Sequence, residues 1–338
     1  MIIVTKPDAT EAQIQHILDR VKEWGLKCEV SRGERRVVIG VIGEEELIRE
    51  KPIAAIPGVE SVTPVLKPYK LVAHEFRQMN SIVKVGNVSV GGEEVIIMSG
   101  PCSVESPEQI IGIAHKVKAA GAKILRGGAF KPRTSPYSFQ GLGVDGLKML
   151  ADAREATGLP VITEIMDTRD LADIEKYADC LQIGTRNMQN FSLLKEVGKS
   201  KLPVMLKRGM SATIKDLLMS AEYILAEGNF NVMLCERGIR TFETWTRNTL
   251  DLSVVPILRA ETHLPVVVDP THGVGLHDHI APMALAAVAA GADSIMCEVH
   301  DSPENAKSDG EQALTPDEFT DLVGRIRKVA VAVGRTAG

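Results

Sequence analysis

A cluster of cationic and hydroxyl side chains marks the stretch 123–139, KILRGGAFKPRTSPYSF. A short apolar run ends there, and a pair of glycines follows it. The cluster consists of Arg126, Lys131, Arg133, Thr134 and Ser135. Guanidinium, ammonium and hydroxyl groups are the usual donors to phosphate and carboxylate. The stretch is therefore either an anion-binding loop at the end of a strand or a basic loop that is simply solvated.

Three further cations follow later apolar runs: they are Arg186, Lys207 and Arg237. If all these charges meet in one place, they repel one another strongly at low dielectric unless anions bind among them. The repeated pattern favours the anion-binding interpretation. It predicts a small-molecule substrate with several negative charges, most simply phosphates and a carboxylate.

A second group of side chains has the chemistry of metal ligands. Cys102 lies in GPCS, His272 in DPTHG and Glu298 in CEVH, and Asp309 follows in the polar segment KSDGEQ. A thiolate, an imidazole and two carboxylates make a plausible site for one divalent ion, and Zn²⁺, Fe²⁺, Mn²⁺ or another ion would fit. Taken singly, Cys102 could instead be a buried structural thiol, and His272 a hydrogen-bonded core histidine.

Glu164, near the end of the run VITEI, leaves two interpretations open. It could orient a lysine or a water, or act in proton transfer. It could equally be a partner that only neutralises Arg126 or Arg186. His277 and His279 also have metal-like spacing, but they open a helical segment, so we interpret them as surface residues.

The elements that must position these residues repeat along the chain. Strand-like apolar runs occupy 95–100, 123–127, 161–165, 180–184, 204–209, 232–238, 266–270 and 294–298. Amphipathic helical segments such as 107–120, 144–157 and 211–227 separate them. Eight strands that alternate with helices predict an α/β fold, a (β/α)8 barrel. A doubly wound sheet is the alternative, but no GxGxxG turn opens the first unit.

Barrel geometry predicts where the chemistry lies, because active sites form at the C-terminal ends of the strands. The candidate residues stand at those ends, which chance alone would not produce at nearly every strand. Strand eight lies beside strand one in a closed barrel, so Cys102, His272 and Glu298 become neighbours. A metal beside a cation-rich pocket suits polarisation of a carbonyl, which favours an aldol-type condensation.

A separate unit precedes the barrel. Residues 1–66 show the order βαββαβ of a ferredoxin-like domain, 67–80 form a linker, and 81–338 form the barrel. Its predicted strands are 1–5, 27–31, 35–42 and 59–66, and its predicted helices are 11–24 and 44–56. A hairpin over 82–94 could plug the barrel end that faces away from the active site.

Composition excludes several classes of protein. The 338 residues are 44% hydrophobic and 25% charged, with a net charge of −5, which is typical of globular proteins and argues against nucleic-acid or membrane partners. No apolar run is long enough to span a bilayer, and the start of the chain lacks a signal-peptide pattern. The five cysteines cannot all pair, so a reducing cytoplasm is the simplest expectation.

At these motifs the sequence resembles the 3-deoxy-D-arabino-heptulosonate 7-phosphate (DAHP) synthases, which open the shikimate pathway to aromatic amino acids. The matching pieces are GPCSVES, LRGGAFKPRTSPYSFQGLG, ITEIMD, IGTRNMQN, LKRGM, CERG, DPTHG and CEVH with KSDGEQ. They span residues 99–312, and KPRTS discriminates best, because the related 3-deoxy-octulosonate 8-phosphate synthases carry a KANRSS-type loop there. The compact barrel with a short N-terminal extension resembles the subgroup that these two enzymes share.

The resemblance implies condensation of phosphoenolpyruvate with erythrose 4-phosphate, with release of phosphate. It implies that phosphoenolpyruvate is held by Arg126, Lys131, Arg186, Lys207 and Arg237. It implies that Arg133, Thr134 and Ser135 meet the erythrose phosphate. It implies that one divalent ion (Mn, Fe, Zn, Co or Cd could serve) is bound by Cys102, His272, Glu298 and Asp309. Lys131 and Glu164 are the candidates for proton transfer.

The resemblance also implies that the N-terminal domain binds tyrosine or phenylalanine as a feedback inhibitor, and that the protein is a homotetramer. A domain used only for assembly is the alternative. Rival functions are an octulosonate phosphate synthase, a Schiff-base aldolase that uses Lys131 or Lys207, and an amino-acid-sensing protein on an inactive barrel. A complete set of metal-type residues and mutually repelling cations disfavours the last of these.

Overall fold

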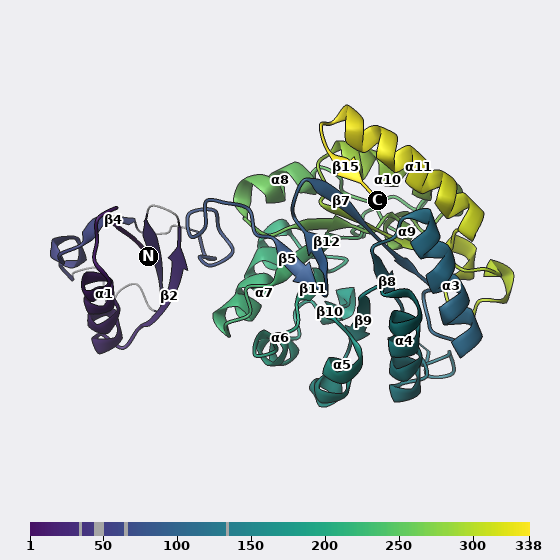
Figure 1. Cartoon of the computed structure of the whole chain (residues 1–338), viewed down its shortest axis with the longest axis horizontal. Coiled ribbons are helices and arrows are strands. Elements are labelled where there is room, and N and C mark those ends of the chain that lie inside the picture. Colours follow the sequence, from purple (N-terminus) through teal and green to yellow (C-terminus); the bar gives the residue numbers. More distant parts are fainter. Residues whose placement is uncertain (34–35, 44–50, 64–66, 133–134) are drawn as a thin grey trace. The chain divides into compact units, whose positions relative to one another are not determined.

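The computed structural model describes residues 1–33, 36–43, 51–63, 67–132 and 135–338 (Figure 1). These residues divide into two compact units. The first comprises Met1–Asn80 with Glu261–His263, and the second comprises Ser81–Ala260 with Leu264–Gly338. No helix among the described ranges is both long and apolar enough to cross a membrane.

The first unit contains a four-stranded antiparallel sheet in the order β2-β3-β1-β4. Its elements are β1 (Ile2–Thr5), α1 (Glu11–Glu23), β2 (Lys27–Arg32), β3 (Val37–Ile42) and β4 (Val59–Thr63). This strand order is that of a ferredoxin-like domain, as predicted. Of the helix predicted over 44–56, residues 44–50 lie outside the described ranges, and the rest contains a 3₁₀ turn at Ile53–Ala55.

Helix α1 forms where its apolar spacing and its cap agree. Thr10 and Gln13 make a capping box that satisfies the first free backbone N–H groups of the helix. Ile14, Ile17 and Val21 recur at helical spacing and are buried against the sheet.

Residues 67–80, predicted as a linker, group with the first unit rather than standing alone. The reason is visible at Gly40 of β3, where an added Cβ would lie 2.9 Å from the Phe76 ring and 3.4 Å from Leu71. The glycine therefore allows this segment to pack directly on the strand.

The second unit is a closed parallel barrel of eight strands. They are β7 (Glu94–Gly100), β8 (Ile124–Arg126), β9 (Val161–Ile165), β10 (Cys180–Ile183), β11 (Val204–Lys207), β12 (Val232–Glu236), β13 (Val266–Val268) and β14 (Ser294–Glu298). Neighbours in the chain pair in parallel, and β14 pairs with β7 to close the ring. The predicted (β/α)8 fold is confirmed, and a two-residue strand, β15 (Thr336–Ala337), also pairs with β7.

Helices follow the strands around the barrel (Figure 1). They are α3 (Pro107–Ala120), α4 (Val144–Thr157), α5 (Leu171–Tyr177), α6 (Phe191–Gly198), α7 (Ile214–Ala226), α8 (Val254–Glu261), α9 (Pro270–Val274), α10 (His277–Ala289) and α11 (Pro316–Ala332). The bounds of α3 and α4 are as predicted. Helix α7 begins three residues later than predicted because Thr213 caps it, with Asp216 completing the capping box.

The hairpin predicted over 82–94 forms from β5 (Val83–Val85) and β6 (Val88–Val90). Val83, Val85 and Val90 are fully buried in one cluster with the inward-facing side chains of the barrel strands. Its turn glycines lie close to the prolines that precede two strands: a Cβ on Gly86 would meet Pro160, and one on Gly91 would meet Pro265. The hairpin therefore fills the N-terminal end of the barrel.

We predict that Val85→Ala lowers the free energy of unfolding by about 2 kcal/mol, because it removes fully buried methyl groups and leaves a cavity. The control is Ile82→Ala on the same segment, since Ile82 is 55% exposed and should change stability by less than about 0.5 kcal/mol. Urea unfolding of both variants measures the difference. Equal stabilities would show that the hairpin is not part of the barrel core.

Candidate active site

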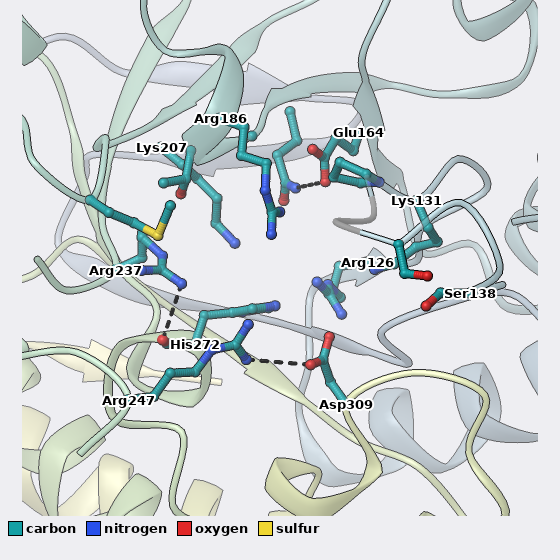
Figure 2. A pocket seen from close by; sticks show the side chains of 16 residues that line it. Arg126, Lys131, Ser138, Glu164, Arg186, Lys207, Arg237, Arg247, His272 and Asp309 are labelled. Carbon is teal, nitrogen blue, oxygen red and sulfur yellow. Dashed lines mark hydrogen bonds and ion pairs between the residues drawn. The ribbon is translucent and has the colours of Figure 1, made fainter. Parts of the chain in front are cut away.

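A cavity of about 360 Å³ opens at the C-terminal end of the barrel strands (Figure 2). Charged side chains dominate its walls. Its predicted members are Arg126, Lys131, Ser135, Glu164, Arg186, Lys207, Arg237, His272 and Asp309. Cys102 and Glu298 lie deeper and are buried. Of the predicted site residues, Arg133 and Thr134 lie outside the described ranges.

The cations reach the cavity from different strand ends. Arg126 ends β8, Lys207 ends β11, and Arg237 directly follows β12. Arg186 lies in a 3₁₀ turn, Thr185–Asn187, just after β10. Figure 2 shows Arg186, Lys207 and Arg237 pointing into the space that His272 borders. The predicted convergence of positive charge is therefore present.

Buried carboxylates compensate two of these charges, which corrects the expectation that only bound anions could do so. Arg126 Nη1 lies 2.7 Å from Glu298 Oε1, and Lys207 Nζ lies 2.6 Å from Asp269 Oδ2. Arg186 and Arg237 make no salt bridge within the described part of the chain. Burial lowers the pKa of Arg237. Among the cations at the strand ends, Arg186 and Arg237 are thus the ones without a salt bridge in the described residues, and an anion would bind on their side of the cavity.

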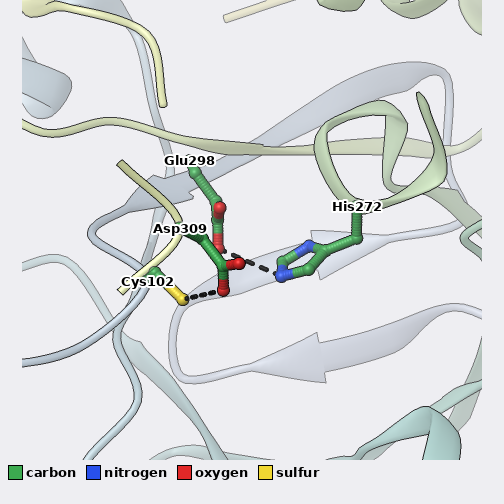
Figure 3. Close-up of side chains that lie close together, drawn as sticks. All are labelled: Cys102, His272, Glu298 and Asp309. Atoms are coloured by element: carbon green, nitrogen blue, oxygen red, sulfur yellow. Dashed lines mark hydrogen bonds and ion pairs between the residues drawn. The ribbon is translucent and has the colours of Figure 1, made fainter. Parts of the chain in front are cut away.

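The four metal-type residues come together as predicted (Figure 3). One donor atom from each of Cys102, His272, Glu298 and Asp309 lies within 4.8 Å of the others. His272 Nε2 is 3.1 Å from Glu298 Oε1, and Cys102 Sγ is 3.0 Å from Asp309 Oδ2. One sulfur, one nitrogen and carboxylate oxygens at this spacing suit a single divalent ion. The donor set therefore fits a metal.

Barrel closure and a strained loop residue bring these donors together. Glu298 pairs with Gly100 in the β14–β7 register, and Cys102 follows two residues later. Asp309 adopts a left-handed backbone conformation, with φ 54° and ψ 30°. It is the one non-glycine residue with positive φ in the described ranges. Aspartate tolerates this conformation better than most residues, and such strain is concentrated at functional sites.

Asp269 connects the cationic and metal-type halves of the site, and the sequence interpretation missed it. Its Oδ2 accepts from Lys207 Nζ and lies 2.6 Å from His272 Nδ1, and the side chain is fully buried. Its Oδ1 accepts from the backbone N–H of His272 at 3.0 Å, because Asp269 caps α9. The dipeptide Asp-Pro is a helix-start signal that could have identified it.

Charge coupling in this cluster is strong. Burial alone would raise the pKa of Glu298, but His272 and Arg126 hold it well below its usual range. Burial lowers the pKa of His272, but Asp269 and Glu298 outweigh burial and raise it to about 10. The anionic surroundings thus favour a bound cation, either a proton or a metal ion that displaces it.

Glu164 borders the cavity and accepts a hydrogen bond from Gln182 Nε2 at 3.2 Å. A Cβ on Gly184 would lie 2.0 Å from Glu164 Oε1, so the glycine makes room for this carboxylate. Glu164 has no salt bridge to Arg126 or Arg186 within the described residues. The interpretation as a neutralising partner is therefore not supported.

Lys131 approaches the metal-type cluster directly. Its Nζ donates to Cys102 Sγ at 2.8 Å and to the Cys102 carbonyl oxygen at 2.9 Å. The close approach to Gly128, where a Cβ would lie 2.8 Å from the lysine Cδ, shows why a glycine stands at this position of the loop.

The sequence interpretation also missed other residues that line the cavity. They are Gln182, Ser138, Met210 and Arg247, of which Arg247 contacts Asp309. Arg247 lies in a long loop with no strand-end signal, so only the folded structure reveals it. By contrast, neither His277 nor His279 borders the cavity, since His277 pairs with Glu318 and His279 is exposed.

Both units of the chain match known protein families. Residues 72–333 match the DAHP synthetase I family, and residues 1–67 match the DAHP synthase ferredoxin-like domain. A phospho-2-dehydro-3-deoxyheptonate aldolase of Thermotoga maritima is 48% identical over 99% of both chains. A 2-dehydro-3-deoxyphosphooctonate aldolase of Caulobacter vibrioides is 31% identical over 72% of this chain and 89% of its own.

Solved structures give the same result. The crystal structure of the Thermotoga maritima DAHP synthase superposes with a TM-score of 0.80 at 47% identity, covering 100% of this chain and 99% of that one. A truncated form of the Thermotoga maritima enzyme covers 80% of this chain and 99% of its own, with a TM-score of 0.75 at 45% identity. From the two family matches and these relatives, we conclude that this chain belongs to the DAHP synthetase I family.

Proposed function

We propose that the protein catalyses a metal-dependent condensation of phosphoenolpyruvate, erythrose 4-phosphate and water to DAHP and phosphate. The observation that carries this proposal is that a metal-type cluster borders the same cavity as arginines that make no salt bridge within the described residues. C3 of phosphoenolpyruvate forms a bond with the aldehyde carbon, and water adds at C2. The hemiketal phosphate then loses phosphate with cleavage of the C–O bond.

The cationic wall binds phosphoenolpyruvate in this proposal. Arg186 and Arg237 make no salt bridge within the described residues, so they meet the phosphate or carboxylate most directly. Arg126 and Lys207 lie beside them, each oriented by a buried acid. The Lys207 nitrogen is held by the buried Asp269 carboxylate at 2.6 Å, which disfavours its use as the nucleophile of a Schiff-base mechanism.

Cys102, His272, Glu298 and Asp309 would hold the divalent ion, which supplies Lewis-acid polarisation of the aldehyde oxygen. Asp269 fixes the orientation of the His272 ring through Nδ1, which leaves Nε2 directed at the cluster. Lys131 and Glu164 border the same space and are the proposed groups for proton transfer around the aldehyde and the water.

The loop after β8 would receive the sugar phosphate through Arg133, Thr134 and Ser135. Ser135 borders the cavity. We propose tyrosine or phenylalanine as feedback inhibitors that act through the N-terminal domain. A homotetramer and a cytoplasmic location stay predictions.

The proposed substrates can be tested directly by an assay of phosphate release. Enzyme stripped with a chelator should release no phosphate from phosphoenolpyruvate, and a divalent metal should restore release with erythrose 4-phosphate. Arabinose 5-phosphate should be turned over at least about tenfold less efficiently, because it leaves the loop contacts misplaced. A preference for the five-carbon sugar would show that the loop after β8 has been misinterpreted.

The role of Asp269 predicts that Asp269→Asn weakens metal binding about 10- to 100-fold, because the neutral amide no longer anchors His272 and Lys207 by its charge. Competition with a chromophoric chelator measures the dissociation constant. Asp173→Asn, an exposed change on α5, is the control with the same chemistry. Equal metal affinities in the two variants would show that Asp269 does not support the metal site.

The proposed feedback inhibition makes a prediction for an enzyme that lacks residues 1–66. If the N-terminal domain carries the inhibitor site, the truncated enzyme should keep turnover but lose inhibition by tyrosine and phenylalanine. Initial rates with and without each amino acid make the measurement. Unchanged inhibition of the truncated enzyme would place the inhibitor site in the barrel.

A further inference from the structure

Arg247 lies in the loop between β12 and α8 and touches the metal-type cluster from outside. Its Nη1 donates to Asp309 Oδ1 at 3.3 Å and to Gln312 Oε1 at 2.9 Å. Gln312 Nε2 in turn donates to Glu298 Oε2 at 2.9 Å. One guanidinium nitrogen therefore reaches both carboxylates of the cluster, one directly and one through a buried amide. Figure 2 shows the direct contact, between Arg247 and Asp309.

The loop around Arg247 is anchored at several points. The Arg247 backbone N–H donates to the Val274 carbonyl oxygen, and an added Cβ on Gly275 would lie 2.5 Å from the arginine Cβ. The next residue, Asn248, donates from Nδ2 to the carbonyl oxygen of His272 at 3.0 Å. The loop thus contacts the segment that carries the histidine and the Asp309 carboxylate directly, and it reaches Glu298 through Gln312.

Asp309 needs such support. Its left-handed backbone conformation is costly for a residue with a Cβ and persists only where the surroundings determine it. Besides the Cys102 thiol and the Ser308 hydroxyl, the Arg247 guanidinium is the group that holds its carboxylate.

We propose that Arg247 is a positioning residue, which together with Gln312 holds Asp309 and Glu298 in the arrangement that binds the divalent ion. This inference rests on the metal-dependent function proposed above. It assigns a task to the part of the β12–α8 loop beyond Arg237, where the sequence predicted no site residue, and it makes the metal site depend on that loop.

The direction in which metal affinity changes when the Arg247 side chain is removed tests the proposal, because charge repulsion alone and positioning predict opposite changes. A guanidinium near a divalent ion repels it, so removing the charge should tighten metal binding if charge were its only contribution. A positioning residue predicts weaker binding when the side chain is removed. A lysine ammonium should restore much of the affinity, because a single nitrogen makes both contacts.

The experiment titrates the metal-free full-length protein with Co²⁺ in competition with a chelator, while the thiolate-to-cobalt absorption band is recorded. Arg247→Ala should raise the dissociation constant about tenfold or more and shift the band, and Arg247→Lys should recover most of both. Arg240→Ala removes an exposed arginine from the same loop and should change affinity less than twofold. Thermal unfolding without metal checks that each variant is folded.

Unchanged or tighter Co²⁺ binding by Arg247→Ala, beside a normal wild-type titration, would overturn the positioning role and leave the proposed function intact. A wild-type protein that binds no Co²⁺ through its thiolate would overturn both. If Arg247→Ala does not fold, Gln312→Leu carries the test, because it breaks only the connection to Glu298 and should also weaken binding.

Discussion

Closure of the barrel between β14 and β7 is the constraint on which the site depends. The pairing of Glu298 with Gly100 brings together residues almost two hundred positions apart. It places the Glu298 carboxylate beside Cys102, which follows β7, and beside Arg126, which ends β8. The hairpin that fills the opposite end supports this ring from inside, since its valines pack on the inward-facing side chains. Packing at one end thus stabilises the geometry of the chemistry at the other.

Within that ring, buried acids divide the positive charge into two kinds. Arg126 and Lys207 are neutralised by Glu298 and Asp269, and these pairs cost desolvation that only good geometry repays. Arg186 and Arg237 lack such partners in the described part of the chain, so the field at the mouth favours an anionic ligand. The acids that neutralise the first pair also contact His272, which couples the anion site to the metal site.

Much of this fold could be predicted because barrel strands are short, fully buried apolar runs with polar residues at one end. That regularity identified all eight strands and the cations and metal-type donors that follow them. Asp269, Arg247 and Gln312 could not be found in this way. Asp269 caps a five-residue helix that resembles a loop in the sequence, and the other two reach the site only through tertiary contacts. The neutralisation of Arg126 by a metal-type carboxylate was likewise invisible in the spacing.

In the proposed function, one divalent ion binds among Cys102, His272, Glu298 and Asp309, beside a phosphoenolpyruvate held by the arginines. Diffraction from crystals grown with Co²⁺ and phosphoenolpyruvate, recorded at the cobalt absorption edge, tests it most directly. We expect one dominant anomalous peak within about 2.0–2.4 Å of donor atoms from these residues, with the ligand phosphate or carboxylate on Arg186 and Arg237. A cobalt peak only at surface histidines, or an empty cluster in phosphoenolpyruvate-bound protein, would contradict it.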